Sequence, residues 1–251
     1  MIVDIHSHIR RNPGNQIKEE EALLADMEKN GVDYRVVSAL EGWPTEEGNR
    51  YISDLVSRYP ERLAGCAVIN PKDDNCGEMA KAALALPGMA MLELNSVEHG
   101  YYPDHCDGIE EVLEAARERK VPVKVFTGIG SRSMPQQWMG HVERHPELTF
   151  IFLHMGCFDY GYGCVDLAEK TPNMVLETSN QYEVQILKKA VTTLPKEKLV
   201  FGSSWPERLT RCSLDVFDMF RLDDTCKEYL FGRNGARILG LNEGEIGADG
   251  K

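Results

Sequence analysis

The sequence lacks the features that mark secreted, membrane-embedded and nucleic-acid-binding chains. Its seven cysteines form an odd, scattered set without a C-x-x-C pair, which argues against a disulfide framework or a structural zinc knot. No apolar run approaches the length of a transmembrane helix, and the opening MIVDIHSHIRR does not resemble a signal peptide. The net charge of −12 is unsuited to neutralising phosphates. We therefore expect a cytoplasmic protein with reduced thiols that binds neither membranes nor nucleic acids.

Apolar runs and helical stripes alternate along the 251 residues, of which 42% are hydrophobic. The runs are short, nearly continuous and rich in β-branched residues, as is typical of strands buried on both faces of a parallel sheet. Helical spacing lies between them, for example at Ile109, Val112, Leu113 and Ala116. The predicted strands cover residues 2–6, 33–40, 63–69, 89–94, 121–126, 148–154, 173–179 and 198–204.

Eight strand–helix units of similar length predict the α/β class and a (β/α)8 TIM barrel. We assign residues 1–241 to this single domain and expect the polar, glycine-rich residues 242–251 to form a flexible tail. A doubly wound open sheet would alternate in the same way. The first predicted strand is not followed by a G-x-G-x-x-G turn, which favours the closed barrel.

Polar residues at the strand ends are the candidates for chemistry, because barrels of this kind carry their active sites at the C-terminal ends of the strands. His6 and His8 close the first run and, being two residues apart in a strand, are predicted to converge. Glu93 lies in the fourth run and His154 ends the sixth. Three imidazoles and a carboxylate are ligand types that zinc prefers, so these four residues predict a site for one divalent cation. Taken singly, each could instead be an ordinary hydrogen-bonded side chain.

Other side chains near the predicted strand ends suit substrate binding or proton transfer. Arg10 and Arg11 follow the first strand and would clamp a substrate carboxylate or phosphate, unless they are simply solvated. Trp138 lies in a segment after a strand, where aromatic residues wall small-ligand pockets. Asp159 is a candidate general base just past the sixth strand, or else a helix cap, and His154 is the other candidate if it binds no metal.

Five segments together carry a family pattern, from residue 2 to about residue 241. They are DIHSH, FLHMG, PNMVLETS, FGSSWP and RNGARILGL. They resemble the D-x-H-x-H strand, the strand-6 H-x-G, the approach to strand 7, the strand-8 F-G-S-D-x-P and the N-A-x-x-L closing helix of the amidohydrolase superfamily. The resemblance is to the amidohydrolase-related branch that includes aminocarboxymuconate-semialdehyde decarboxylase and related hydratases and lactonases. It implies an enzyme on a TIM barrel.

Two positions depart from that pattern. Phe126 stands where the resembling family has a strand-5 histidine that binds metal. Ser204 replaces the strand-8 aspartate that binds metal and takes the proton of the attacking water, and a neutral hydroxyl cannot serve as that base. Glu93 resembles the strand-4 ligand of the TatD-like deoxyribonuclease branch. The implied metal site therefore lacks two of its usual ligands and holds one ion rather than two. Lys124, in the predicted fifth strand, is expected to face either the barrel or the helices.

These observations predict a metal-dependent hydrolase that attacks a small organic, carboxylate-bearing substrate with a single metal-activated water. Three alternatives stay open. The two arginines also suit a decarboxylase. A metal-free lactonase of the same branch is another alternative, although those lactonases retain the strand-8 aspartate. The departures at Phe126 and Ser204 would suit a non-catalytic barrel that binds a small ligand. A homodimer is expected only because it is the commonest soluble oligomer.

Overall fold

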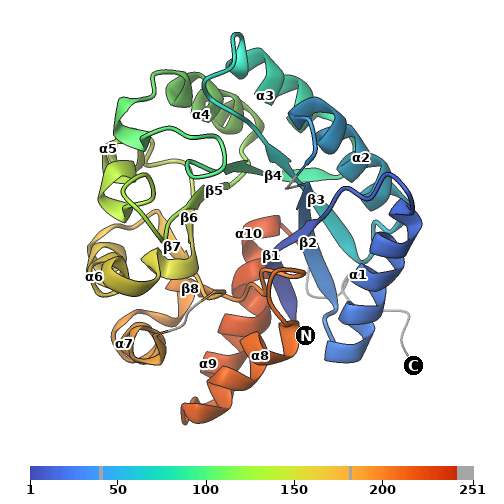
Figure 1. Ribbon diagram of the computed structural model, residues 1–251. Coiled ribbons are helices and arrows are strands. Elements are labelled where there is room, and N and C mark those ends of the chain that lie inside the picture. The colour runs from blue at the N-terminus through green and yellow to red at the C-terminus, as the bar shows by residue number, and fades with distance from the viewer. Residues whose placement is uncertain (40–41, 181–182, 242–251) are drawn as a thin grey trace.

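The computed structural model shows eight parallel strands arranged in chain order around a barrel, which confirms the predicted fold class (Figure 1). It describes residues 1–39, 42–180 and 183–241, apart from the side chain of Asp159, so the predicted flexible tail, 242–251, lies outside the described residues. The strands are β1 (Val3–Ile9), β2 (Tyr34–Ala39), β3 (Leu63–Val68), β4 (Met89–Leu94), β5 (Val123–Phe126), β6 (Phe150–Leu153), β7 (Met174–Glu177) and β8 (Leu199–Val200).

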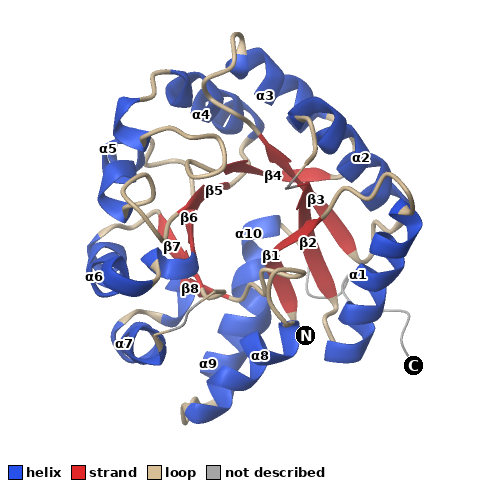
Figure 2. Cartoon of the chain, in the orientation of Figure 1, coloured by secondary structure: helices blue, strands red, loops and turns tan. Residues whose placement is uncertain are grey.

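Most of the helices form a ring outside the strands, whereas the last one lies against one end of the barrel, as Figure 2 shows. They are α1 (Gln16–Asn30), α2 (Thr45–Arg58), α3 (Cys76–Ala85), α4 (Gly108–Arg119), α5 (Met139–Arg144), α6 (Gly161–Lys170), α7 (Val184–Thr193), α8 (Thr210–Asp215), α9 (Asp224–Glu228) and α10 (Asn234–Leu239). Within the described ranges, no helix combines the length and the apolarity needed to cross a bilayer.

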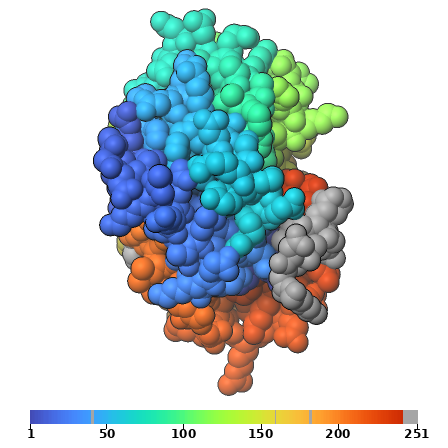
Figure 3. Space-filling view, turned by 90° about the vertical axis from the view of Figure 1, so that its right-hand side faces the viewer, coloured from blue at the N-terminus to red at the C-terminus, as the bar shows by residue number. Residues whose placement is uncertain are grey.

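The barrel closes where β1 meets the segment that follows β8. The backbone N–H of Ile5 donates to Phe201 O at 3.1 Å, and that of His8 donates to Trp205 O at 2.7 Å. β8 is shorter than the predicted strand 198–204, because the chain beyond Val200 leaves the regular ladder and follows β1 instead. The first and last parts of the chain consequently lie side by side, which Figure 3 shows as blue and orange surfaces in contact.

Two apolar clusters stabilise the barrel. The larger one packs the outer strand faces against the helices and includes the predicted α4 stripe, all of whose members are buried. The smaller one fills the barrel interior, with residues such as Ile5, Cys66 and Ile151, and is joined by Ala236 of α10. At Gly235 of α10, an added Cβ would lie 2.8 Å from the Val3 side chain, so only glycine allows this helix to cover the end of the barrel.

Candidate active site

A cavity of about 600 Å³ lies at the C-terminal ends of the strands, where barrels carry their chemistry. All four predicted metal ligands are on its wall. The wall also receives side chains from β5 and from the segments after β7 and β8. Its polar and aromatic members include His6, His8, Glu93, Asn95, Phe126, His154, Asn180, Ser204, Glu207 and Arg208.

Three buried imidazole rings lie next to one another in this cavity, with His6 in the middle. The ring centroids of His6 and His8 are 4.5 Å apart, and those of His6 and His154 are 5.1 Å apart. In a regular strand, Ile5 and His6 would face opposite sides of the sheet. Here both face the inside of the barrel. The pairing of β1 with β2 shifts register between Asp4 and Ser7, and Ile5 packs in the interior cluster directly below the histidines.

The orientation of His8 is fixed by a serine and a carboxylate. Ser38 on β2 donates its hydroxyl hydrogen to Glu93 Oε2 at 3.1 Å, and its oxygen lies 2.9 Å from His8 Nδ1. Because the only hydroxyl hydrogen is used toward Glu93, His8 Nδ1 must be the donor in the second contact. The other ring nitrogen of His8, Nε2, is therefore the one without a hydrogen.

A second carboxylate–serine–histidine chain orients His154. Ser179 donates to Glu177 Oε2 at 2.9 Å and accepts from His154 Nδ1 at 3.0 Å. Glu177 also accepts from the backbone N–H of His154 and of Ser179. Burial raises the pKa of Glu177 to about 7 and lowers the pKa of His154 to about 4. At neutral pH, His154 is thus an uncharged base whose Nε2 carries the lone pair.

Lys124 faces the barrel interior, which settles the question of which side of β5 it occupies. Its Nζ lies 3.0 Å from Glu93 Oε2, and neither side chain is exposed. Its contact with His6 Nδ1, at 3.4 Å, is longer. Burial opposes the charge on Lys124, but the neighbouring Cys66 and Glu93 raise its pKa, so that it stays an ammonium ion. Burial, His8 and Lys124 together hold the pKa of His6 well below its usual range.

Two groups of described residues bring three ligand atoms within 4.8 Å of one another: His6, His8 and Glu93, and His6, His154 and Glu177. The four predicted ligands therefore do not form one such group in the described part of the chain. Both Glu177 oxygens already accept hydrogen bonds. By contrast, His6 Nε2 and Glu93 Oε1 are buried and, among described residues, unpartnered. Buried polar atoms rarely stay unsatisfied, so the first group fits a divalent cation better.

Arg208 brings a positive charge to the cavity wall. Its Nε donates to Asn180 Oδ1 at 2.8 Å and its Nη1 donates to Glu207 O at 3.0 Å. These bonds hold the guanidinium at the cavity wall, where it suits a carboxylate or phosphate. Arg208 was not among the site residues predicted from the sequence.

The predicted substrate contacts occupy other places. Arg10 and Arg11 are not among the described residues that line the cavity: Arg10 pairs with Glu207 at its rim, and Arg11 pairs with Glu47. Trp138 is fully buried, and its Nε1 donates to Phe126 O at 3.1 Å. We therefore correct the predicted substrate contact of Trp138 to a role in the core, because the segment after β5 folds back against the helices. The side chain of Asp159 lies outside the described residues.

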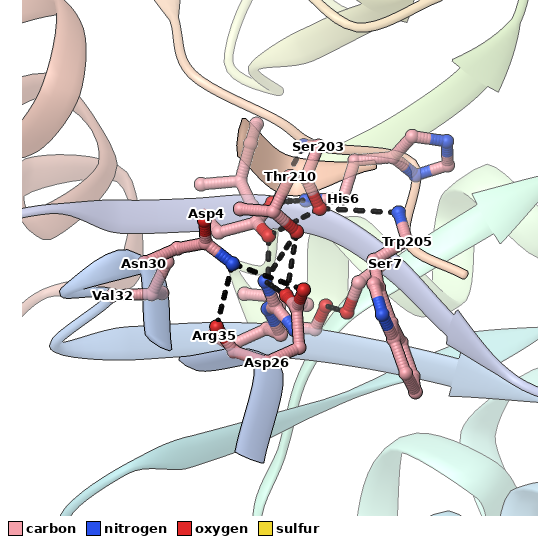
Figure 4. Close-up of polar contacts among 12 residues, drawn as sticks. Asp4, His6, Ser7, Asp26, Asn30, Val32, Arg35, Ser203, Trp205 and Thr210 are labelled. Atoms are coloured by element: carbon pink, nitrogen blue, oxygen red, sulfur yellow. Dashed lines mark hydrogen bonds and ion pairs between the residues drawn. The ribbon is translucent and has the colours of Figure 1, made fainter. Parts of the chain in front are cut away.

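A buried ion pair beneath the histidines ties β1 to its neighbours (Figure 4). Asp4 accepts from Arg35 Nε at 2.9 Å and from Ser203 Oγ at 2.6 Å. Arg35 continues to Asp26 of α1 at 2.8 Å. Asp4 thus acts on the site indirectly, by holding the histidine strand against β2 and the segment after β8.

The family model described as Amidohydrolase matches residues 3–241. The chain belongs to the amidohydrolase family. This confirms the resemblance drawn from the five sequence segments and assigns the chain to a family of enzymes. A search of curated proteins finds no match.

Solved structures of the family share the fold at low sequence identity. The chain is similar to 5-carboxyvanillate decarboxylase from Sphingomonas paucimobilis, at 16% identity and a TM-score of 0.73, covering 96% of this chain and 99% of that one. It is also similar to 5-carboxyvanillate decarboxylase from Novosphingobium aromaticivorans, complexed with manganese and 4-hydroxy-3-methoxy-5-nitrobenzoic acid, at 14% identity and a TM-score of 0.72, covering 96% of each chain. A third similar structure is a probable 2-pyrone-4,6-dicarboxylic acid hydrolase from Acinetobacter baumannii with citric acid bound, at 14% identity and a TM-score of 0.74, covering 96% of this chain and 99% of that one.

Several residues of the site were not predicted from the sequence. Ser38, Ser179 and Glu177 are among them, although each lies at or just after a strand end. A polar residue inside an otherwise apolar run, such as the serine in VVSAL or the glutamate in VLETS, is the signal that could have found them. Arg208 follows the last strand by several residues and carries no comparable signal.

Proposed function

We propose that the protein is a metal-dependent hydrolase that acts on a small, anionic organic substrate. One observation carries the proposal: His6 Nε2 and Glu93 Oε1 are buried and unpartnered among described residues, beside a His8 ring whose Nδ1 is bound to Ser38. His6, His8 and Glu93 would hold one divalent cation, zinc by ligand type. When bound, such an ion polarises a substrate carbonyl and acidifies water.

His154 is the general base in this proposal, in place of the aspartate that Ser204 replaces. The Ser179–Glu177 pair holds the hydrogen on His154 Nδ1 and so keeps Nε2 ready to take a proton from water. The Phe126 ring lies 5.2 Å from the His154 ring, centroid to centroid, and shields this side of the base from solvent. The predicted base Asp159 remains the alternative.

Lys124 supports the proposed ligands without binding the cation. Its ion pair with Glu93 Oε2 directs the other oxygen of that carboxylate to the cavity. Outer contacts of this kind orient the ligands of metal sites. With a cation on His6 Nε2, the hydrogen of that ring would sit on Nδ1, and Lys124 would keep Glu93 and Ile5 O as its acceptors.

The anionic part of the substrate is assigned to Arg208, whose guanidinium is held by Asn180 and the Glu207 carbonyl. A fixed guanidinium binds a carboxylate through two parallel hydrogen bonds. Arg10, the predicted clamp, would contribute only from the rim, through its pair with Glu207.

Metal content tests the proposal directly. The purified protein is stripped with chelator, refilled with Zn²⁺, Mn²⁺ or Co²⁺, dialysed and subjected to elemental analysis. We expect about one equivalent of ion in the wild type and less than a tenth in Glu93→Gln and His8→Ala. His105→Ala is the control, because this exposed histidine lies outside the cavity. A wild type that retains less than a tenth of an equivalent of every ion would contradict the proposal.

A decarboxylase is the second candidate, favoured by Ser204 on the cavity wall. Removing a carboxyl group requires no attacking water, so the loss of a carboxylate base matters less there. Two of the three similar solved structures described above are decarboxylases by name. Product analysis separates the two reactions, because decarboxylation releases carbon dioxide and hydrolysis does not.

We also propose a cytoplasmic, homodimeric enzyme that binds no nucleic acid. All seven cysteines are free thiols, consistent with a reducing compartment. Sedimentation of the purified protein measures the oligomeric state.

A further inference from the structure

A second hollow adjoins the candidate active site. It has a volume of about 380 Å³ and lies between the segment after β7, α7 and α8. Three residues, Asn180, Glu207 and Arg208, line both this groove and the histidine cavity. The two hollows therefore share a wall, and the shared wall carries the guanidinium described above.

The rest of the groove is largely apolar. Leu187, Leu209 and Val216 line it, and Leu209 is 70% exposed, so its side chain is accessible to an apolar ligand. Thr178 also lines the groove, and its buried hydroxyl has no hydrogen-bond partner among the described residues. An apolar trough with one unsatisfied hydroxyl is typical of a ligand subsite.

The charges in the shared wall favour an anion at the junction. Arg208 is held there by Asn180 Oδ1 at 2.8 Å. The acidic Glu207 is paired with Arg10 at 2.9 Å, so its charge is compensated. A carboxylate bound at Arg208 can therefore extend one part of its molecule toward the histidines and another into the groove.

We propose that the groove is a subsite for an apolar arm of the substrate, and that the substrate's carboxylate sits at Arg208 between this arm and the reacting group. The substrate class is then an amphiphilic organic acid rather than a fully polar one. The position of the reacting group and the carboxylate contact at Arg208 rest on the proposed function, and the binding of the apolar arm goes beyond it.

Equilibrium binding of plain carboxylates tests this subsite without any turnover. Acetate, butyrate, hexanoate and octanoate are titrated into the full chain by calorimetry, with 1-octanol as the uncharged probe. We expect affinity to rise about two- to fourfold per added methylene as the arm is buried. We expect 1-octanol to bind at least about tenfold more weakly than octanoate, because it lacks the charge that Arg208 contacts.

Two exposed positions provide variants that keep the fold. Leu209→Ser removes apolar surface from the groove and should flatten the dependence on chain length. Ile17→Ser is the matched control, because Ile17 on α1 has the size of leucine and is 66% exposed, and it should leave the dependence on chain length unchanged.

A third variant tests the charge at the junction. Arg208→Gln should weaken the binding of all four acids by a similar factor, about tenfold, and preserve the ratios of their affinities.

Affinity that is independent of chain length, or a chain-length dependence that survives Leu209→Ser, would overturn the subsite. Absence of carboxylate binding would do the same. These outcomes are distinct from failure of the proposed function, which would show as missing metal or missing hydrolysis while the carboxylate series still bound as expected.

Discussion

Lys124 and Glu93 form an ion pair of 3.0 Å inside the barrel, and neither side chain has any exposed surface. Lys124 comes from β5 and Glu93 from β4, so the pair joins neighbouring strands just beneath the histidines. A buried pair of this kind holds geometry more than it adds stability, because both charges have lost their hydration. The position of Glu93, and with it the proposed metal site, depends on the ammonium beside it.

Breaking this pair should destabilise the fold strongly. We expect Lys124→Met to lower the free energy of unfolding by about 3–5 kcal/mol, because it leaves the buried Glu93 carboxylate without a compensating positive charge. The double variant Lys124→Met/Glu93→Gln should recover much of that loss. Urea unfolding measures both, with Lys81→Met as the control at a solvent-exposed pair, expected to change stability by less than about 1 kcal/mol. Equal losses of stability in Lys124→Met and in the control Lys81→Met would show that the Lys124–Glu93 pair is not buried.

The two serine relays should have separate effects. Ser38→Ala releases His8 and is expected to weaken metal affinity by about 10- to 100-fold. Ser179→Ala releases His154, a base rather than a ligand in our proposal, and should slow hydrolysis of the ester probe 4-nitrophenyl acetate about tenfold or more. Competition with a chelating dye measures the first effect and a rate assay the second. If Ser179→Ala loses metal as severely as Ser38→Ala, His154 is a ligand after all.

Glu110 should make stability depend on pH. Burial opposes its charge, but hydrogen bonds from Arg144 and two histidines outweigh burial and lower its pKa from 4.5 to about 2. A carboxyl whose pKa is lower in the folded chain adds stability that is present above the unfolded value and is lost as the pH falls through the folded one. Glu110→Gln should therefore melt below the wild type at pH 7, with the gap closing toward pH 2.

The expected gap is modest, because the Glu110 side chain is 41% exposed and its ion pair is screened by solvent. Thermal melts across this pH range measure it. Glu61→Gln, at an exposed residue outside this cluster, is the control and should follow the wild type at every pH. A gap that stays constant down to pH 2 would rule out the titration of Glu110 as its cause.

Two variants of Trp138 distinguish a structural role in the core from a contact with the substrate. Trp138→Ala should cost about 3–5 kcal/mol of stability, since it removes a fully buried aromatic side chain. Trp138→Phe keeps most of that volume but loses the hydrogen bond to Phe126 O, and we expect its octanoate affinity to stay within about twofold of the wild type. Stability is measured by urea unfolding and affinity by calorimetry. A large loss of octanoate affinity in the folded Trp138→Phe variant would restore the predicted substrate contact.

The strands could be predicted well because strands buried on both faces leave nearly continuous apolar runs. The last strand differed most from its predicted bounds, and β1 extends to Ile9 instead of ending at residue 6. Residues 201–204 continue the apolar and small-residue pattern, yet they hydrogen-bond to β1 in a way that depends on barrel closure rather than on local sequence. Such long-range pairing leaves no trace in the periodicity of the segment itself.

The polar site was harder to predict. His6, His8, Glu93 and His154 could be chosen because imidazoles and a carboxylate at barrel strand ends are few. The side of β5 that Lys124 faces could not be predicted, because the strand is buried on both faces and the sequence does not show which face holds its partner. Trp138 was misassigned for a related reason: a loop after a strand can turn toward the cavity or back to the core, and the sequence does not distinguish these paths.

The closure between β1 and the segment after β8 also has a consequence for biosynthesis. Asp4 and Ser203, which join across it, are 199 positions apart in the chain. The histidine strand leaves the ribosome long before the segment near residue 205 and lacks one of its two neighbours until that segment has been synthesised. During translation its edge is therefore open to wrong pairing, and the candidate site is completed only after the segment near residue 205 has been synthesised.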